Sequence, residues 1–277
     1  MNDLLIIGAT GTTGRRVVNL LGERGVVTRQ ATRKPSSPGQ VRLDWADRST
    51  HEDALRGVRG VYLIAPIGVT DPVPLVEPFL EEALRQGVRR VVQLSSSALP
   101  EGAPGLGAVH HLVRSMMPEW TVLRPSWFMQ NFIGRHLVAQ GVGDGEIVTA
   151  TGNGRVAFID AGDIAAVAGR ALTDEIPHNT EHLLTGPQAL SYADAARILT
   201  QRTGRTITHR SVSPTAAAKR IAAQGIPAQF AEMLAAMDTE ISQGAEDRVT
   251  DTVEAITGRP ARSFEAFAAD NFPVQQN

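Results

Sequence analysis

Cysteine is absent from this chain of 277 residues. Without thiols the chain can form no disulfide, bind no metal through thiolates and use no cysteine nucleophile. The seven histidines are scattered, and only His110 and His111 are neighbours in the sequence. Because a metal site needs several such ligands in one cluster, we expect no bound metal.

Long apolar runs and an excess of positive charge are also missing. No run approaches the roughly 18 apolar residues that a membrane-spanning helix needs. The stretch MNDLLIIG at the start has no basic leader and too short an apolar run for a signal peptide. The formal net charge of −2 does not favour a nucleic-acid-binding face. We therefore expect a cytoplasmic protein with neither a membrane nor a nucleic acid as partner.

Short apolar runs alternate with helical patterns through the first half of the chain. The expected strands are 4–7, 26–32, 41–43, 60–65, 90–94 and 121–123. The expected helices are 12–24, 50–56, 74–86 and 107–115. Such alternation with short links produces parallel strands and right-handed crossovers. We therefore expect an α/β fold with a Rossmann-like, doubly wound parallel sheet.

The second half is less regular. Its expected helices are 162–172, 191–203, 214–224 and 227–240, with one strand at 182–184. Ser191 is the expected N-cap of its helix. We expect a cofactor-binding domain over 1–150, on which 154–172 also packs. Residues 173–277 are then a smaller, mostly helical substrate lobe or lid that does not fold independently.

The stretch GATGTTGRR, residues 8–16, follows the first expected strand and opens the first expected helix. Amides at a helix N-terminus point toward an anion, and the helix dipole favours negative charge there. Gly8 permits the tight turn, Gly11 leaves room for a pyrophosphate, and Gly14 lets the helix pack near the sheet. The stretch predicts a dinucleotide site. Three hydroxyls add hydrogen-bond donors: Thr10, Thr12 and Thr13.

The end of the second expected strand bears on the choice of cofactor. NAD-binding proteins place an acid about 20 residues beyond the glycine turn, where it holds the ribose 2′-hydroxyl. The stretch VTRQATRK over 27–34 has no acid, and the first acid after Glu23 is Asp44. Arg33 and Lys34 offer positive charge that suits a 2′-phosphate, unless they are simply solvated loop residues. We therefore favour NADP(H) over NAD(H).

A tyrosine four residues before a lysine is missing. Reductases of the short-chain type normally protonate their product with such a pair. The chain has two tyrosines, Tyr62 and Tyr192, and the residues four further on are Pro66 and Ala196. The usual proton relay is therefore absent.

Five stretches carry a resemblance to a known family: GATGTTG, VYLIAP, VVQLSSSAL, WTVLRPSWFMQNF and FIDAGDIAAVA. Together they resemble the NmrA-like group of atypical short-chain dehydrogenase/reductases. Residues 105–132 are most similar to the festuclavine/agroclavine dehydrogenase branch of ergot-alkaloid enzymes and its bacterial relatives. The resemblance implies a Rossmann-like fold that binds NADP(H). The group contains iminium, quinone and carbonyl reductases, and also NADP-binding regulators without enzymatic activity.

The resemblance also implies contacts for individual residues. Asp44 and Trp45 would lie near the adenine, and Ala65 and Pro66 would flank the middle of the cofactor. The remaining implied contacts are Ser95 and Ser96 at the nicotinamide ribose, Pro125, Trp127 and Phe128 on the nicotinamide side, and Asn131 in the substrate cleft. Many relatives have a lysine at the start of the helix after strand five, where this chain has Leu106 or Gly107.

Two residues are candidate proton donors near the expected cleft. A histidine there can titrate near neutral pH, but adjacent helical residues cannot both face inward. At most one of His110 and His111 is then catalytic, and we select His111. The second candidate is Ser97. The alternatives are a solvated or packed histidine and a serine that serves the turn.

The densest aromatic stretch follows the last strand of the first half. Ligands bind at the carboxyl ends of strands in open α/β sheets, so Trp127 and Phe128 are candidate pocket residues. Phe158 and the pair Met233 and Met237, four apart on a helix face, are candidates for a deformable lid. Simple core packing is the alternative for each of them.

The missing tyrosine pair bears on the acceptor. Hydride delivered to an iminium carbon yields a neutral amine, and a quinone yields a stabilised phenolate. A plain ketone would give an alkoxide, a poor product without an acid nearby. We therefore expect a reductase of an activated acceptor on a bulky, apolar small molecule: an iminium, a quinone, or a conjugated or polycyclic ketone.

Natural-product tailoring, a part of secondary metabolism, is the setting that we expect for this reductase, and the protein itself is expected to be a monomer or a homodimer. The alternative function is a non-catalytic, NADP-binding redox sensor that regulates a partner. The missing acid is compatible with both functions.

Overall fold

The structure is a computed structural model that describes residues 3–273, and it forms two compact units. Unit 1 contains the chain up to Pro125 together with Ala161–Leu184 and Ala255–Gly258. Unit 2 contains Ser126–Asp160, Thr185–Glu254 and the chain from Arg259 onward. This division differs from the expected boundary at residue 150, because 126–160 belongs to unit 2 and 161–184 to unit 1.

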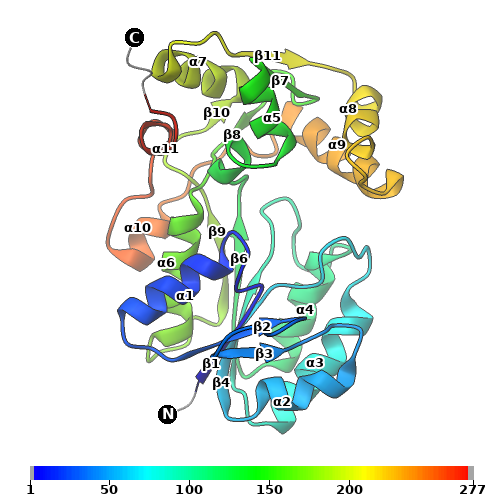
Figure 1. The fold of residues 1–277 in the computed structure, drawn as a ribbon, viewed down its shortest axis with the longest axis vertical. Helices are drawn as coiled ribbons and strands as arrows, with labels where there is room; N and C mark the ends of the chain where they lie inside the picture. Colours follow the sequence, from blue (N-terminus) through cyan, green and yellow to red (C-terminus); the bar gives the residue numbers. More distant parts are fainter. Residues whose placement is uncertain (1–2, 274–277) are drawn as a thin grey trace. The chain divides into compact units, whose positions relative to one another are not determined.

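A single seven-stranded sheet forms the centre of unit 1, in the order β3-β2-β1-β4-β5-β6-β9 (Figure 1). All of its pairings are parallel, and the order is that of a Rossmann sheet extended by one strand. The strands are β1 (Asp3–Ile7), β2 (Thr28–Thr32), β3 (Gln40–Arg42), β4 (Val58–Leu63), β5 (Arg90–Leu94), β6 (Glu119–Pro125) and β9 (Thr180–Leu184). The expected doubly wound parallel sheet is confirmed. β9 falls within residues 173–277, where the sequence predicts the lobe, and it pairs with β6 in this sheet.

Helices cover both faces of this sheet. Figure 1 shows α1 (Gly14–Glu23) beside α6 (Ala161–Thr173) on one face. The other face carries α2 (His51–Leu55), α3 (Val73–Arg85) and α4 (Leu106–Met116), with a 3-10 turn at Arg48–Thr50 before α2. Leu4, Leu5 and Ile6 are all fully buried, as expected for a parallel strand covered on both sides.

Unit 2 is mainly helical, with two short strand pairs. Its helices are α5 (Leu137–Asp144), α7 (Tyr192–Thr203), α8 (Pro214–Ala222), α9 (Ala228–Ser242) and α11 (Phe264–Asn271). β7 (Glu146–Thr149) pairs in parallel with β11 (Thr208–Ser211), and β8 (Arg155–Val156) pairs antiparallel with β10 (Leu190–Ser191). Unit 2 also contains the 3-10 turn Met129–Phe132. The helix α10 (Thr252–Thr257) begins in unit 2, and its residues from Ala255 onward are assigned to unit 1. Ser191 caps α7 in a reciprocal bond pattern with Asp194, which confirms the expected cap.

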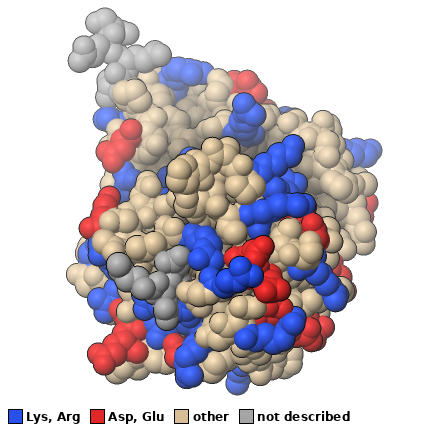
Figure 2. Space-filling view, turned by 60° about the horizontal axis from the view of Figure 1, so that its bottom comes forward, with Lys and Arg blue, Asp and Glu red and all other residues tan. Residues whose placement is uncertain are grey.

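The surface carries charges of both signs. On the face shown in Figure 2, basic side chains lie next to acidic ones rather than in a separate patch. Exposed ion pairs such as Arg42 with Asp47 and Arg56 with Glu52 fit this pattern. Within residues 3–273, no helix is both long and apolar enough to cross a membrane.

Candidate functional site

The carboxyl ends of the central strands bring several predicted residues to one edge of the unit 1 sheet. The register pairs Ile7 with Ala31, Leu63 with Gln93, and Leu94 with Leu123. Because the strands are parallel, the segments that follow them emerge at the same edge. These segments are Gly8–Gly14 after β1, Arg33 and Lys34 after β2, Ile64–Pro66 after β4, and Ser95–Ser97 after β5.

The glycine turn after β1 needs glycine at two positions for steric reasons. Gly8 has φ +70°, a left-handed conformation that strains other residues. A Cβ added at Gly14 would lie 2.2 Å from the carbonyl oxygen of Gly8. Gly11 donates its amide to that same oxygen at 2.8 Å, and it is exposed. The turn is therefore tightly closed against the start of α1 while its outer side stays open.

The N-terminus of α1 carries amides without acceptors. Thr13 is the N-cap residue, and its side chain makes no capping hydrogen bond. The amides of Thr12, Thr13 and Gly14 have no hydrogen-bond acceptor within residues 3–273. Thr10 and Thr12 are exposed beside them. Free amides at the positive end of a helix form a site for an anion such as a diphosphate.

Tyr62 supports this turn from inside the unit, a role that the sequence analysis did not identify. Its hydroxyl donates to Oγ1 of Thr13 at 3.0 Å, and both residues are buried. The hydroxyl oxygen of Thr13 thus accepts a hydrogen bond from the interior, and its contact with a cofactor stays a prediction. Burial raises the pKa of Tyr62, so the phenol stays protonated at neutral pH. The register, which pairs Tyr62 with Ile6, places this side chain behind the turn.

Two cations and one tryptophan flank the neighbouring loops. Arg33 and Lys34 are exposed, and neither has an ion-pair partner in the described part of the chain. Asp44 accepts a hydrogen bond from the amide of Ala46 on Oδ1 at 3.1 Å. The Trp45 ring packs edge-on against core residue Phe79, with 5.2 Å between ring centroids. Because Arg33 and Lys34 are exposed and have no ion-pair partner in the described part of the chain, their side chains are available to a phosphate group.

A buried hydroxyl lies in the segment after β5. Ser95 Oγ has no hydrogen-bond partner among residues 3–273, although it is buried. Such a group costs about 1–3 kcal/mol unless a ligand or water supplies a partner. Ser97 is buried as well, whereas Ser96 is half-buried. The unpartnered hydroxyl and the glycine turn fit the polar groups of a dinucleotide.

Other predicted cofactor contacts are placed by β4 and β6. Ala65 is buried and Pro66 is half-buried after the end of β4. Pro125 is the last residue of β6, and its carbonyl accepts the amide of Ser97 at 2.9 Å. Their contacts with a cofactor stay predictions.

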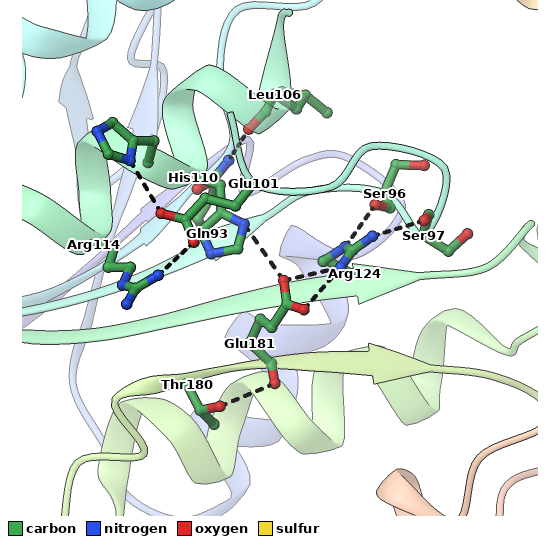
Figure 3. Close-up of polar contacts among 11 residues, drawn as sticks. Gln93, Ser96, Ser97, Glu101, Leu106, His110, Arg114, Arg124, Thr180 and Glu181 are labelled. Atoms are coloured by element: carbon green, nitrogen blue, oxygen red, sulfur yellow. Dashed lines mark hydrogen bonds and ion pairs between the residues drawn. The ribbon is translucent and has the colours of Figure 1, made fainter. Parts of the chain in front are cut away.

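The two adjacent histidines of α4 face opposite ways. His110 is buried, and burial lowers its pKa. His111 is exposed, and its Nδ1 lies 3.1 Å from Oε1 of Glu101, which also accepts a hydrogen bond from Arg114 at 2.6 Å. His111 therefore lies in a cluster with Glu101 and Arg114. Figure 3 shows the ion pair between Glu101 and Arg114. A catalytic role for His111, as for Ser97, stays a prediction.

The predicted substrate residues belong to unit 2 and differ in burial. Trp127, Phe128 and Asn131 are half-buried, and Met237 is half-buried on α9, where Met233 is 39% exposed. Phe158 is 1% exposed and packs edge-on against Phe132 and Tyr192, with 5.1 and 5.2 Å between ring centroids. The structure thus gives the Phe158 ring a packing role in the core of unit 2. Sequence reasoning cannot distinguish such a ring from a pocket wall, because both are apolar.

Metal ligands do not gather in the described structure. No group of three His, Asp or Glu side chains within residues 3–273 has a geometry that could hold an ion. The positions at the sheet edge are instead amides, hydroxyls and cations, which are groups that bind phosphates and sugars.

Comparison with known proteins relates the whole chain to NAD(P)-binding oxidoreductases. The sequence model of the NmrA-like family matches residues 107–267, and that of an NAD(P)H-binding family matches residues 8–175. The oxidoreductase YesF of Bacillus subtilis is 48% identical over 97% of this chain and 94% of its own length. The agroclavine dehydrogenase of Claviceps fusiformis is 36% identical over 97% of this chain and 96% of its own length. The NADPH complex of the Escherichia coli quinone oxidoreductase QOR2 has the same fold, with a TM-score of 0.82 at 24% identity over 97% of this chain and 99% of that chain.

Proposed function

The chain belongs to the NmrA-like family, and from that premise we propose that it is an NADPH-dependent reductase of an activated acceptor. The acceptor is an iminium, a quinone, or a conjugated or polycyclic ketone on a bulky apolar molecule, as in natural-product tailoring. The observation that carries the proposal is the glycine turn with free amides at the start of α1. When bound there, the reduced nicotinamide cofactor supplies a hydride.

The residues of unit 1 fit the parts of this cofactor. The amides of Thr12, Thr13 and Gly14 suit the diphosphate, because they have no acceptor of their own in the described chain. Ser95 offers a buried hydroxyl without a partner, which suits a ribose or amide group of the ligand. These groups bind and orient the cofactor without taking part in proton transfer.

The preference for NADP(H) rests on charge. Arg33 and Lys34 follow β2 without ion-pair partners within residues 3–273, and no acid stands at the end of that strand. A guanidinium binds a phosphate dianion through charge-assisted hydrogen bonds, whereas a 2′-hydroxyl gains little from it. The predicted site therefore favours the phosphorylated cofactor.

The acceptor class rests on the missing proton donor. Neither tyrosine has a lysine four residues further on, and both are buried. Burial raises the pKa of Tyr192 as it does for Tyr62, which makes both phenols weak acids. An iminium or quinone needs no strong acid at the moment of hydride transfer. Agroclavine dehydrogenase and YesF, both oxidoreductases by name, support a reductase of a small molecule.

The proposal is tested by binding first and turnover second. NADPH added to the purified full-length protein is expected to raise Tm and quench tryptophan fluorescence, with NADH weaker. A panel of quinones, cyclic iminium salts and polycyclic ketones is then assayed by the loss of reduced-nicotinamide absorbance. Turnover of at least one class is the expected result. Equal affinity for NADPH and NADP⁺ with no turnover of any class would contradict the reductase and favour the redox-sensing regulator instead.

A further inference from the structure

Arg124 on β6 connects β9 with the segment that follows β5, at the carboxyl edge of the unit 1 sheet (Figure 3). It precedes the last residue of β6, and its side chain is only 12% exposed. Its Nη1 donates to both carboxylate oxygens of Glu181 on β9, at 2.9 and 3.0 Å. Its Nη2 donates to the carbonyl of Ser97 at 3.0 Å, and Nε to the carbonyl of Ser96 at 3.4 Å. One guanidinium therefore holds the segment after β5 against β6 and β9.

The held segment, Ser95–Ser97, contains the polar groups that the proposed function assigns to the cofactor. It has no helix or strand of its own. Two backbone bonds to β6 anchor its amides, from Ser95 to Leu123 at 2.7 Å and from Ser97 to Pro125 at 2.9 Å. Arg124 donates from its side chain to the carbonyls of Ser96 and Ser97, and the amide of Leu99 also donates to the carbonyl of Ser96 at 3.2 Å. Arg124 thus contacts the two residues that directly follow Ser95.

The contacts of Arg124 depend on the planar, forked shape of its guanidinium group. Arg124 addresses one carboxylate and two carbonyls that lie in different directions, which a planar group with five N–H donors can do. A lysine ammonium is a point charge and cannot keep all three contacts in the same geometry. Glu181 compensates the charge of the buried guanidinium, and Nδ1 of His110 lies 3.6 Å from Oε2 of the same carboxylate.

We infer that Arg124 is a positioning residue: it fixes the segment Ser95–Ser97 in the geometry that cofactor binding and hydride transfer require. The inference rests on the proposed function, because it concerns the same site. It adds a residue that contacts neither cofactor nor substrate in the proposal and acts through the serine segment alone.

Arg90 provides a matched control in the same sheet. Its side chain is also 12% exposed, it pairs with Glu119 at 2.9 Å, and it donates to the backbone carbonyl of Asp174 at 2.6 Å. It is the first residue of β5, so it lies at the amino edge, away from the serine segment. Substitution of either arginine removes a buried charge and its contacts to backbone carbonyls. Only the substitution of Arg124 is expected to affect the site.

The experiment compares R124Q, R124K and R90Q with the wild-type full-length protein. Hydrogen exchange of the peptide over 93–99 is measured without cofactor, the Kd for NADPH is measured by fluorescence, and single-turnover hydride transfer is measured with the acceptor that wild type reduces fastest. We expect R124Q to speed the exchange and to slow hydride transfer about 100-fold, since misplacement by about 1 Å has effects of this size. The Kd is expected to rise about tenfold, which is about 1.4 kcal/mol. R124K is expected to fall between R124Q and wild type.

The control separates positioning from stability. R90Q is expected to lower Tm as R124Q does, and to leave the exchange of 93–99, the Kd and the transfer rate at wild-type values. Equal losses of NADPH affinity and transfer rate in R124Q and R90Q would overturn the inference. A lower Tm in R124Q without a change in exchange or Kd would overturn it as well. Wild-type protein that bound no nicotinamide nucleotide would refute the proposed function instead. In that case, faster hydrogen exchange of 93–99 in R124Q would still show that Arg124 keeps the segment Ser95–Ser97 in place.

Discussion

At the amino edge of the unit 1 sheet, Arg90 pairs with Glu119 and donates to the carbonyls of Leu172 and Asp174, at 3.3 and 2.6 Å, around the end of α6. At the carboxyl edge, Arg124 pairs with Glu181 and donates to carbonyls of a segment outside any helix or strand. A cation at a helix C-terminus also meets the negative end of the helix dipole, so the amino-edge contact stabilises a regular element. The carboxyl-edge contact instead holds a segment without regular secondary structure.

The difference extends to the other groups at the two edges. The carboxyl edge leaves amides of the glycine turn without acceptors and Ser95 Oγ without a partner, within the described residues. Parallel sheets bind ligands at that edge because helix N-termini point toward it. Unsatisfied polar groups there are available to a ligand, whereas the satisfied contacts at the amino edge serve the fold. Substitutions at the carboxyl edge are therefore expected to weaken cofactor binding, and substitutions at the amino edge are expected to lower stability without changing binding.

The largest effect is expected from Gly14→Ala at the carboxyl edge. The new Cβ would lie 2.2 Å from the carbonyl oxygen of Gly8, so the turn must shift away from its closed geometry. We expect the Kd for NADPH to rise about 100-fold or more, equivalent to about 3 kcal/mol of strain and lost contacts. Isothermal titration and the cofactor-induced rise in Tm measure this effect.

Gly22→Ala in the same helix is the control for that substitution. Gly22 is exposed, and an added Cβ would meet nothing within 4 Å. Alanine is the better helix former by about 1 kcal/mol, so this variant is expected to be more stable with an unchanged Kd. Similar losses of binding in both variants would contradict the role of the turn.

A smaller effect is expected from Arg33→Ala, which tests the charge at the end of β2. Removal of a charge-assisted contact to a 2′-phosphate is expected to weaken NADPH about tenfold and to leave NADH unchanged. Lys219→Ala, on exposed α8 of unit 2, removes the same charge elsewhere and is expected to change neither Kd. Equal weakening of NADPH and NADH by Arg33→Ala would refute the preference for NADP(H).

The smallest effect is expected on the pH dependence of stability, from His182 in β9. Burial, and after it the charge interaction with the neighbouring His178, lower the pKa of His182 to about 4. Nδ1 of His178 lies 2.8 Å from Nε2 of His182. The unfolded chain takes up a proton near pH 6.5 while the folded state resists it, so stability is full above that pH and falls as the pH drops toward 4. Burial also lowers the pKa of His51, His110, His136 and His209, and these contribute in the same direction.

His182→Asn is therefore expected to make this acid loss shallower without removing it. Urea unfolding between pH 7 and pH 4.5 measures the change in slope. The Kd for NADPH at pH 7 is expected to match wild type, since His182 lies in β9, outside the segments of the proposed site. An unchanged slope would show that the folded His182 takes up its proton near pH 6.5.

Local patterns predicted much of unit 1 because several of its strands contain short apolar runs. Leu4–Ile7 has no polar residue and is buried, as expected for a parallel strand covered by helices on both sides. Strands of unit 2 were not predicted, since Thr208–Ser211 is polar and mostly exposed and becomes a strand only by pairing with Glu146–Thr149. Phe158 shows the same limit: the sequence leaves a deformable lid and core packing open for it, and the structure packs its ring against Phe132 and Tyr192.

By itself, the sequence determined the strand–glycine turn–helix unit and the lack of a Tyr-x-x-x-Lys pair, because both are set by neighbours along the chain. Only the tertiary structure decided that Tyr62 supports Thr13, that His110 rather than His111 faces inward, and that Arg124 holds Ser96 and Ser97. These contacts join residues 27 or more positions apart, or depend on which face of a helix meets the sheet. The physical reason is that such contacts arise from the order and register of parallel strands, which no local pattern encodes.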